Sequence, residues 1–181
     1  KVQYQNNKNA GTAFVIVTGK KGYKGKVVMP FTIKAETIEK PSDIAIKNIP
    51  DKTYNGKLQK PSVSVTIQKN GKVKKFSNKD YTVVYKNNLH AGEATVVVTG
   101  KGNYAGLTAT AKFTIKPQQI KKASFKGVQG SLVLTYSKRT LKEGTDYKKT
   151  EYGTAKKNKI PVTIEGINDF TGTMTKNVKV Q

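Results

Sequence analysis

The stretch YKNNLHAGEATVVVTGKGNYAG, Tyr85–Gly106, closely repeats the stretch YQNNKNAGTAFVIVTGKKGYKG, Tyr4–Gly25, which lies 81 residues earlier in the chain. At this offset, 14 of the first 25 residues are identical. The identical residues include the apolar positions Ala13/Ala94, Val15/Val96 and Val17/Val98. Side chains at every second position share one face of an extended strand. The repeat therefore predicts strands whose shared face turns inward to form a core.

Turn residues repeat together with this apolar face. Asn6-Asn7 matches Asn87-Asn88, and three glycines also match. These glycine pairs are Gly11/Gly92, Gly19/Gly100 and Gly25/Gly106. Because glycine and asparagine tolerate the positive φ of tight connections, we expect turns at these positions. Two tyrosine pairs, Tyr4/Tyr85 and Tyr23/Tyr104, recur as well, which predicts tyrosines that pack inside or hold turns.

A third and fainter copy follows. It contains TDYKKTEY, ending at Tyr152, VTIEGINDFTG at Val162–Gly172, and VKV at Val178–Val180, with Phe170 at the position of Tyr104. A period of about eighty residues gives room for about seven short strands, which is the size of a small two-sheet sandwich. No apolar residues persist at helical spacing, so we expect little helix. In the second copy the expected strands are Ile44–Ile49, Lys52–Tyr54, Ser62–Gln68, Lys72–Phe76, Tyr81–Lys86, Glu93–Thr99 and Leu107–Lys116.

The first copy begins at the strand equivalent to Tyr81–Lys86, so we expect it to lack the first half of its sandwich. The start KVQYQNN is interpreted as that of an excised piece. Phe14 and Ile16, opposite the repeated face, are expected to be covered by a neighbour, or else to be ordinary exposed residues of a twisted edge. The proline-containing links Lys34–Asp43 and Lys116–Lys122 predict limited swivel between copies and an elongated array.

Composition excludes several classes of function. The formal net charge is +23, and Arg139 is the single arginine among 34 basic residues. Without cysteine, the chain has no disulfide, cysteine metal site or thiol nucleophile. Apolar runs such as Phe14–Val17 are far shorter than the roughly 20 residues of a membrane helix, so no membrane insertion is expected.

The lysines have two interpretations. In strands such as Lys72–Phe76, lysine alternates with apolar residues, which is typical of the solvated face of a sheet and discourages aggregation at sheet edges. The functional interpretation is attraction to polyanions, such as wall polymers, acidic glycans or nucleic acid. Specific nucleic-acid recognition is not expected, because arginine is nearly absent and no binding motif is present.

Few residues are candidates for chemistry. The single histidine, His90, stands where the first copy has Asn9, so we interpret it as a turn residue rather than a catalytic base. Asp80 and Asp146 precede equivalent tyrosines and are interpreted as turn acids that bond the backbone. Asn168 and Asp169 offer oxygens for calcium, but calcium needs about six or more ligands and the chain is strongly basic, so no metal site is predicted. The sequence thus predicts no catalytic, cofactor or metal residues and leaves any ligand residues unknown.

The string DYTVVYKNN…AGEATVVVTGKGNYAG…FTI resembles the tandem immunoglobulin-like repeats of secreted or wall-attached surface proteins of Gram-positive, clostridia-like bacteria. The resemblance covers Lys1–Lys34 and Lys75–Lys116 well and Thr145–Val180 loosely, since the third copy lacks the NN…AG turn. It implies an all-β fold of tandem immunoglobulin-like sandwiches. The expected copies are residues 1–36, the C-terminal part of a first repeat, 37–117, a complete repeat, and 118–181, a divergent repeat. Modules of this kind can carry a lysine–asparagine bond beside a buried acid, which composition does not locate here.

The expected function is that of a non-catalytic, extracellular or cell-wall attached stalk, spacer or adhesion segment, with neighbouring repeats as partners. The alternative is a binding module for anionic wall polymers, glycans or a host surface, which predicts lysines or aromatics gathered on one face. An enzyme would instead require a cleft that brings His90 together with acids from distant strands.

Overall fold

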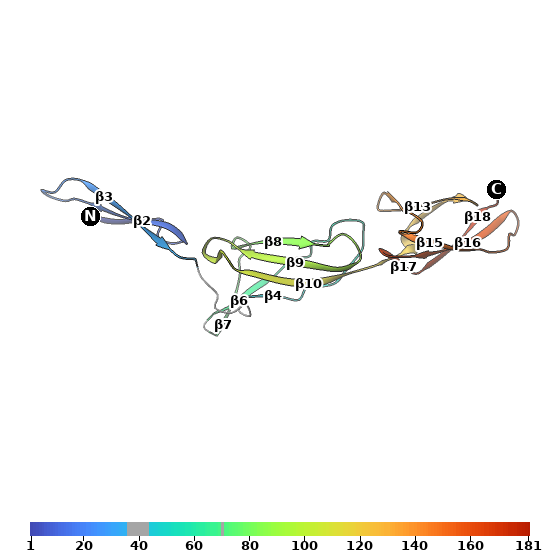
Figure 1. Ribbon diagram of the computed structural model, residues 1–181, viewed down its shortest axis with the longest axis horizontal. Helices are drawn as coiled ribbons and strands as arrows, with labels where there is room; N and C mark the ends of the chain where they lie inside the picture. Colours follow the sequence, from blue (N-terminus) through green and yellow to red (C-terminus); the bar gives the residue numbers. More distant parts are fainter. Residues whose placement is uncertain (36–43, 70) are drawn as a thin grey trace. The chain divides into compact units, whose positions relative to one another are not determined.

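The computed structural model describes residues 1–35, 44–69 and 71–181, whose regular structure consists of β-strands and two short 3-10 segments, η2 (Gly102–Tyr104) and η3 (Ile120–Lys122) (Figure 1). The prediction of an all-β chain with little helix is therefore confirmed for the described residues. Most of the predicted link Lys34–Asp43, together with Asn70, lies outside them.

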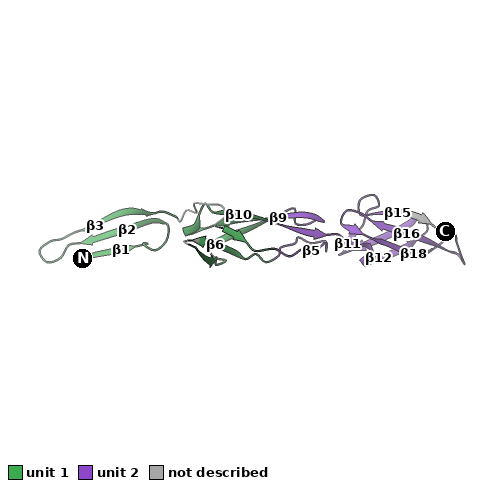
Figure 2. Ribbon diagram, turned by 90° about the horizontal axis from the view of Figure 1, so that it is seen from below, with its two compact units in different colours: residues 1–48, 62–84, 96–111 green, residues 49–61, 85–95, 112–181 purple. Residues whose placement is uncertain are grey.

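The contact pattern divides the chain into two compact units (Figure 2). The first unit consists of Lys1–Asn48, Ser62–Val84 and Val96–Ala111, and the second of Ile49–Pro61, Tyr85–Thr95 and Lys112–Gln181. These limits differ from the boundaries predicted after residues 36 and 117, because the longest strands of the second copy contribute to both units. The division into three copies stays a prediction.

The first unit holds two antiparallel three-stranded sheets. One has the order β1-β2-β3 and the other the order β4-β6-β7. Their strands are β1 (Val2–Gln5), β2 (Gly11–Thr18), β3 (Lys26–Ile33), β4 (Ile44–Ile46), β6 (Val65–Lys69) and β7 (Lys72–Lys75). The register places Tyr4 opposite Val15, and Ala13 opposite Phe31. The repeated apolar positions of neighbouring strands thus share one face of the first sheet.

A four-stranded sheet of order β5-β10-β9-β8 contributes to both units. Its strands are β5 (Lys52–Thr53), β8 (Tyr81–Lys86), β9 (Gly92–Gly100) and β10 (Thr108–Lys116). The strand predicted at Tyr81–Lys86 matches β8, and the other strands predicted in the second copy differ from the observed ones by a few residues at their ends.

The second unit contains the remaining strands. They form a six-stranded sheet of order β14-β13-β12-β18-β16-β15 and a parallel pair, β11-β17. The strands are β11 (Gln118–Gln119), β12 (Ser124–Val128), β13 (Ser131–Tyr136), β14 (Arg139–Thr140), β15 (Tyr147–Tyr152), β16 (Lys159–Gly166), β17 (Phe170–Thr171) and β18 (Thr173–Lys179). The three strands recognised from the sequence correspond to β15, β16 and β18, whereas β12 to β14 have no counterpart in the repeat pattern.

The predicted alternation produces the core in the second and third copies. Along β9, Ala94, Val96 and Val98 are fully buried, and along β16 Val162 and Ile164 are fully buried. Burial of this apolar face is the main stabilising contribution expected for such a sheet.

The same face of the first copy is largely exposed, which corrects the prediction that the repeated face turns inward to form a core there. Ala13 is buried, but Val15 is only half-buried and Val17 is 37% exposed. Tyr4 and Tyr23 are also exposed, so neither packs inside in the first copy; the alternative, that they hold turns, stays a prediction. The equivalent Tyr85 and Tyr104 are half-buried.

On the opposite face of β2, Phe14 and Ile16 are half-buried. They pair across the sheet with Pro30 and Val28 of β3. Coverage of these two side chains by a neighbour stays a prediction.

The repeated glycines serve two different purposes. Gly92 has a φ of 131°, a value that favours glycine, and its counterpart Gly11 has the same value. At Gly100 the reason is different, because a Cβ there would lie 2.1 Å from the Tyr104 carbonyl oxygen. The prediction of positive φ at Gly19 and Gly100 is therefore wrong; these positions need glycine because another stretch of backbone approaches them closely.

Candidate functional site: a repeated joint

The tip of the loop between β8 and β9 is held in a fixed position. The Asn88 side chain, which is buried, donates from Nδ2 to the Gln59 carbonyl oxygen at 2.7 Å. In return, the Gln59 N–H donates to the Asn88 carbonyl oxygen at 2.7 Å. Positive φ at Asn87 and Gly92 lets the chain turn on either side of this anchor. The residues between them, His90 and Ala91, therefore project as a defined tip.

The turn that follows β16 carries Asp169. The Asn168 side chain donates from Nδ2 to the Thr145 carbonyl oxygen at 2.8 Å, and Asn168 has a φ of 56°. The Phe170 N–H donates to the Ile167 carbonyl oxygen at 3.0 Å, which closes the turn. Gly166 is required at its start, since a Cβ there would lie 2.9 Å from Cβ of Phe170.

The tip of the β8–β9 loop and the turn after β16 contact each other through two hydrogen bonds. The Ala91 N–H donates to Asp169 Oδ1 at 2.7 Å, and His90 Nδ1 lies 2.7 Å from Asp169 Oδ2. The Asp169 side chain is only 9% exposed, whereas that of His90 is 72% exposed. The carboxylate thus provides the acceptor for a backbone N–H that would otherwise lose its partner on leaving water. We call this contact the His90–Asp169 joint.

An aromatic cluster lies beside the joint. The rings of Tyr54 and Tyr136 each meet the ring of Phe170 edge-on, with centroids 5.5 Å and 5.4 Å away. The Gln118 N–H donates to the Asp169 carbonyl oxygen at 2.9 Å, and Gln118 Nε2 donates to Tyr136 Oη at 3.0 Å. Edge-to-face aromatic pairs contribute about 0.5 to 1.5 kcal/mol each beyond the area they bury. The cluster and these hydrogen bonds make the joint a packed region and not a single contact.

An ion pair between the half-exposed Arg139 and the buried Asp146 completes this region. Arg139 donates from both terminal nitrogens to the Asp146 carboxylate, at 2.9 Å and 2.6 Å, and also reaches Tyr54 Oη at 3.4 Å. Burial alone would raise the pKa of the Asp146 carboxyl, but hydrogen bonds from Arg139 and from the Lys142 N–H outweigh it and hold this pKa below its usual range. The carboxylate in turn raises the pKa of the Arg139 guanidinium, so the pair is fully charged at neutral pH.

The first unit contains the same contact between equivalent residues. The Ala10 N–H donates to Asn103 Oδ1, and Asn103 Nδ2 donates to Asn9 Oδ1 at 3.1 Å. Asn9 and Ala10 are the counterparts of His90 and Ala91, and Asn103 is the counterpart of Asp169 in the turn GKGNY aligned with GINDF. The second joint thus replaces an asparagine pair with a histidine and an aspartate while keeping the bond from the alanine N–H. In the first copy this turn carries Gly22, which has no side-chain acceptor.

The structure assigns most of the candidate residues to turns and joints. His90 lies in a turn, as predicted, but nothing in the sequence indicates that it bonds Asp169. Asp146 accepts the Lys142 N–H at 2.8 Å, which confirms it as a turn acid, and Asp80 joins the equivalent turn through its backbone. Sequence reasoning missed the role of Arg139 altogether, although its being the single arginine of a lysine-rich chain was a usable signal.

A histidine held by a carboxylate also raises the question of acid–base catalysis. A hollow of about 390 Å³ lies beside His90, and its lining consists of Leu58, Asn87, Asn88, Leu89, His90, Ala91, Gly92 and Glu93. This lining offers no hydroxyl or thiol nucleophile. The equivalent contact in the first unit is made by two asparagines, Asn9 and Asn103, whose side chains cannot transfer protons near neutral pH. The geometry therefore favours a structural role for the pair.

Within the described parts of the chain, no group of three or more histidine, cysteine, aspartate or glutamate side chains is placed to hold a metal ion. Over the same residues, no helix has the length and apolar character needed to cross a membrane. A scan against family models and searches of curated proteins and of solved structures found no match to this chain.

The joint makes a direct prediction for Asp169→Ala. The change removes the acceptor of the Ala91 N–H. Hydrogen exchange at the Ala91 amide should therefore accelerate about 5- to 150-fold, the effect of losing a hydrogen bond of about 1 to 3 kcal/mol. Asp169→Asn keeps an acceptor oxygen and copies the joint of the first unit, so its exchange rate should stay within a few-fold of the original. An Ala91 amide that exchanges equally fast in all three proteins would contradict the proposed joint.

The lowered pKa of Asp146 predicts a dependence of stability on pH. Because the folded-state pKa lies below the unfolded value, the ion pair contributes fully above about pH 4 and less as the pH falls through the folded pKa. Urea unfolding at pH 7 should show Asp146→Asn to be less stable by about 1 to 3 kcal/mol, and the difference should shrink toward pH 2. Asp51→Asn, which alters the exposed Asp51–Lys116 pair, is the control and should change little. A difference between Asp146→Asn and the original protein that is constant with pH would show that the charge is not responsible.

Proposed function

We propose that this chain is a non-catalytic array of immunoglobulin-like modules that serves as a stalk, spacer or adhesion segment of a bacterial surface protein, extracellular or attached to the cell wall. The sequence resemblance supplies the family and the location. The proposal requires modules joined in a fixed way, because a spacer that swivels freely does not hold a distance.

One observation carries the proposal. At two loop tips, of sequence Asn-Ala-Gly and His-Ala-Gly, the alanine N–H donates to a side chain of the following copy. The acceptor is an asparagine in the first case and an aspartate in the second, and each lies in the equivalent turn of its copy. The donor side of the contact, Ala10-Gly11 and Ala91-Gly92, is identical in the two copies. Its recurrence with different side chains supports selection for the connection itself and not for a shared ligand. The drift of exposed residues between copies, such as Lys8 against Leu89, agrees with this interpretation.

Small-angle X-ray scattering tests the spacer function. A compact protein of 181 residues has a radius of gyration of about 16 Å, and a stiff array should clearly exceed this value. Replacing both acceptors, in the double variant Asn103→Ala and Asp169→Ala, should broaden the distribution of distances between the chain ends, whereas the double variant Lys86→Ala and Lys126→Ala, at exposed strand positions, should not. A radius near that of a compact globule would contradict the spacer function.

A second function, binding of anionic polymers, is favoured by a separate feature of the third copy. Lys156 and Lys159 face each other across a hairpin, with mutual backbone hydrogen bonds of 2.7 Å and 2.9 Å. Positive φ at Lys157 and Asn158 forms the tight turn between them. Together the three lysines line a hollow of about 720 Å³. Like charges placed opposite one another destabilise a strand pair, and a bound polyanion would relieve this repulsion.

Titration with heparin at two salt concentrations tests this second function. The triple variant Lys156→Ala, Lys157→Ala, Lys159→Ala should weaken binding about 10-fold at low salt and reduce the slope of log K against log salt by about 2. Its control is Lys20→Ala, Lys24→Ala, Lys26→Ala, which removes the same charge from exposed positions of the first copy. Equal effects of the two triple variants would contradict a site at the hairpin and indicate general charge attraction.

A further inference from the structure

The repeated face of β1–β3 is an open apolar surface. Val2, Val27 and Phe31 are 57%, 57% and 38% exposed, and Val17 lies on the same face. In the second copy, the counterpart of Phe31 is Phe113, which is buried. An apolar face of this extent on a sheet indicates an interaction surface.

The second copy shows what covers such a face. Its sheet β4-β6-β7 brings the buried side chains Ile44, Val65 and Ile67. Phe76, directly after β7, is buried against Tyr81 at the start of β8, with ring centroids 6.2 Å apart. Residues 44–69 and 71–76 therefore act as the half-repeat that closes the sandwich over the alternating face.

Two polar anchors tie this half-repeat to the repeated strands. Tyr85 Oη donates to the Pro61 carbonyl oxygen at 2.5 Å, and Asn88 Nδ2 donates to the Gln59 carbonyl oxygen at 2.7 Å. The first copy keeps both donors, as Tyr4 and Asn7, and both are exposed. It thus presents hydrogen-bond donors at positions where the second copy binds backbone carbonyls of the covering segment.

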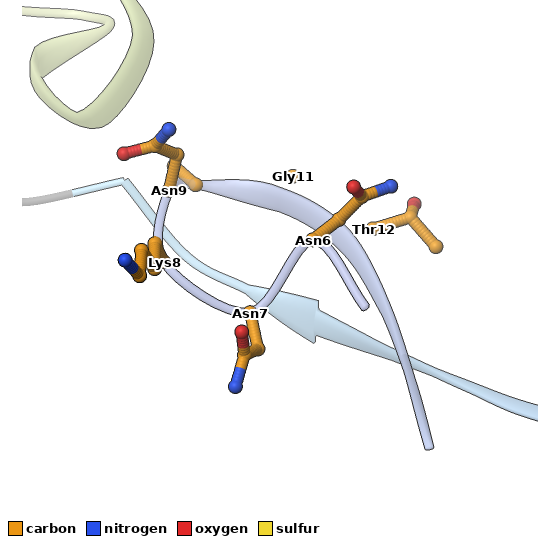
Figure 3. A pocket seen from close by; sticks show the side chains of 7 residues that line it. Asn6, Asn7, Lys8, Asn9, Gly11 and Thr12 are labelled. Carbon is orange, nitrogen blue, oxygen red and sulfur yellow. The ribbon is translucent and has the colours of Figure 1, made fainter. Parts of the chain in front are cut away.

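In the first copy a hollow lies beside Asn7, one of these two donors. Figure 3 shows the loop between β1 and β2 with Asn6, Asn7, Lys8 and Asn9 around it. The hollow has a volume of about 520 Å³. Its counterpart in the second copy is smaller, about 390 Å³, and is lined in addition by Leu58 of the covering segment.

We propose that the face of β1–β3 binds a half-repeat, a polypeptide segment with the pattern of Ile44–Phe76 whose isoleucines and valines cover Val17 and Phe31. In this complex the Tyr4 hydroxyl and the Asn7 amide bond backbone carbonyls of the segment, as Tyr85 and Asn88 do in the second copy. The surface is specific for this partner, because a second β1–β3 face would cover the apolar side chains but would bring no such carbonyls to the two donors. This inference stands apart from the spacer function, since it concerns closure of one sandwich and not the joints between copies.

The test uses the full chain, labelled with ¹⁵N, and an unlabelled synthetic peptide of residues 43–81. Addition of the peptide should shift the amide resonances of β1, β2 and β3 and slow their hydrogen exchange about 100-fold. Val17→Asp, on the proposed face, should abolish these changes, whereas Ile16→Asp, on the opposite face of the same strand, should retain them. Tyr4→Phe and Asn7→Ala should each weaken binding about 10-fold.

A fusion that places residues 43–81 directly before Lys1 gives a second measurement that does not depend on peptide solubility. The amides of β2 should gain protection in the fusion and lose it when Val17→Asp is added. Protection in either experiment that Val17→Asp removes supports the proposal. The proposal is overturned if neither experiment protects β2, if the peptide binds equally well to Val17→Asp, or if the chain alone protects β2 by self-association as its concentration rises.

Discussion

A backbone N–H at a loop tip, once it is withdrawn from water, must find an acceptor, and in this chain the acceptor comes from a different copy of the repeat. Ala91 finds it in the Asp169 carboxylate and Ala10 in the Asn103 amide oxygen. Each tip has the same Ala-Gly pair, and the positive φ of the glycine lets the chain turn directly after the alanine whose N–H donates. The other features of the joint, including the aromatic cluster around Phe170, surround this one contact.

The two joints differ in how their polar groups are used. Asn9 and Asn103 form a neutral pair, in which Asn103 both accepts and donates. In the second joint a carboxylate replaces the amide, and an imidazole takes the place of the asparagine as its partner. The second joint is also supported by the charged pair Arg139–Asp146, which reaches Tyr54 of the preceding copy. The divergent third copy thus retains the connection while changing nearly all the side chains that make it.

Much of the local structure could be predicted from the sequence, because it follows from neighbouring residues. Alternation predicted the buried face of β9, and glycine and asparagine predicted the loop that contains Asn87 and Gly92. The reason for Gly100 could not be predicted, because the carbonyl that approaches it is positioned by the fold of the turn. Whether Val17 is buried also depends on another segment. Its strand matches that of Val98 in sequence, but burial requires a second sheet that covers the strand. The joint was missed for the same reason, since His90 and Asp169 are 79 residues apart and belong to different copies.

Residual dipolar couplings measure most directly whether the His90–Asp169 joint holds its two sides as one body. Backbone couplings would be recorded for residues 85–95 on one side and 118–181 on the other, all of which belong to the second compact unit. A single alignment tensor that fits both segments, with the same magnitude and orientation, is the predicted result. Two tensors of different magnitude would show that the segments reorient independently, and the joint would then be an incidental contact.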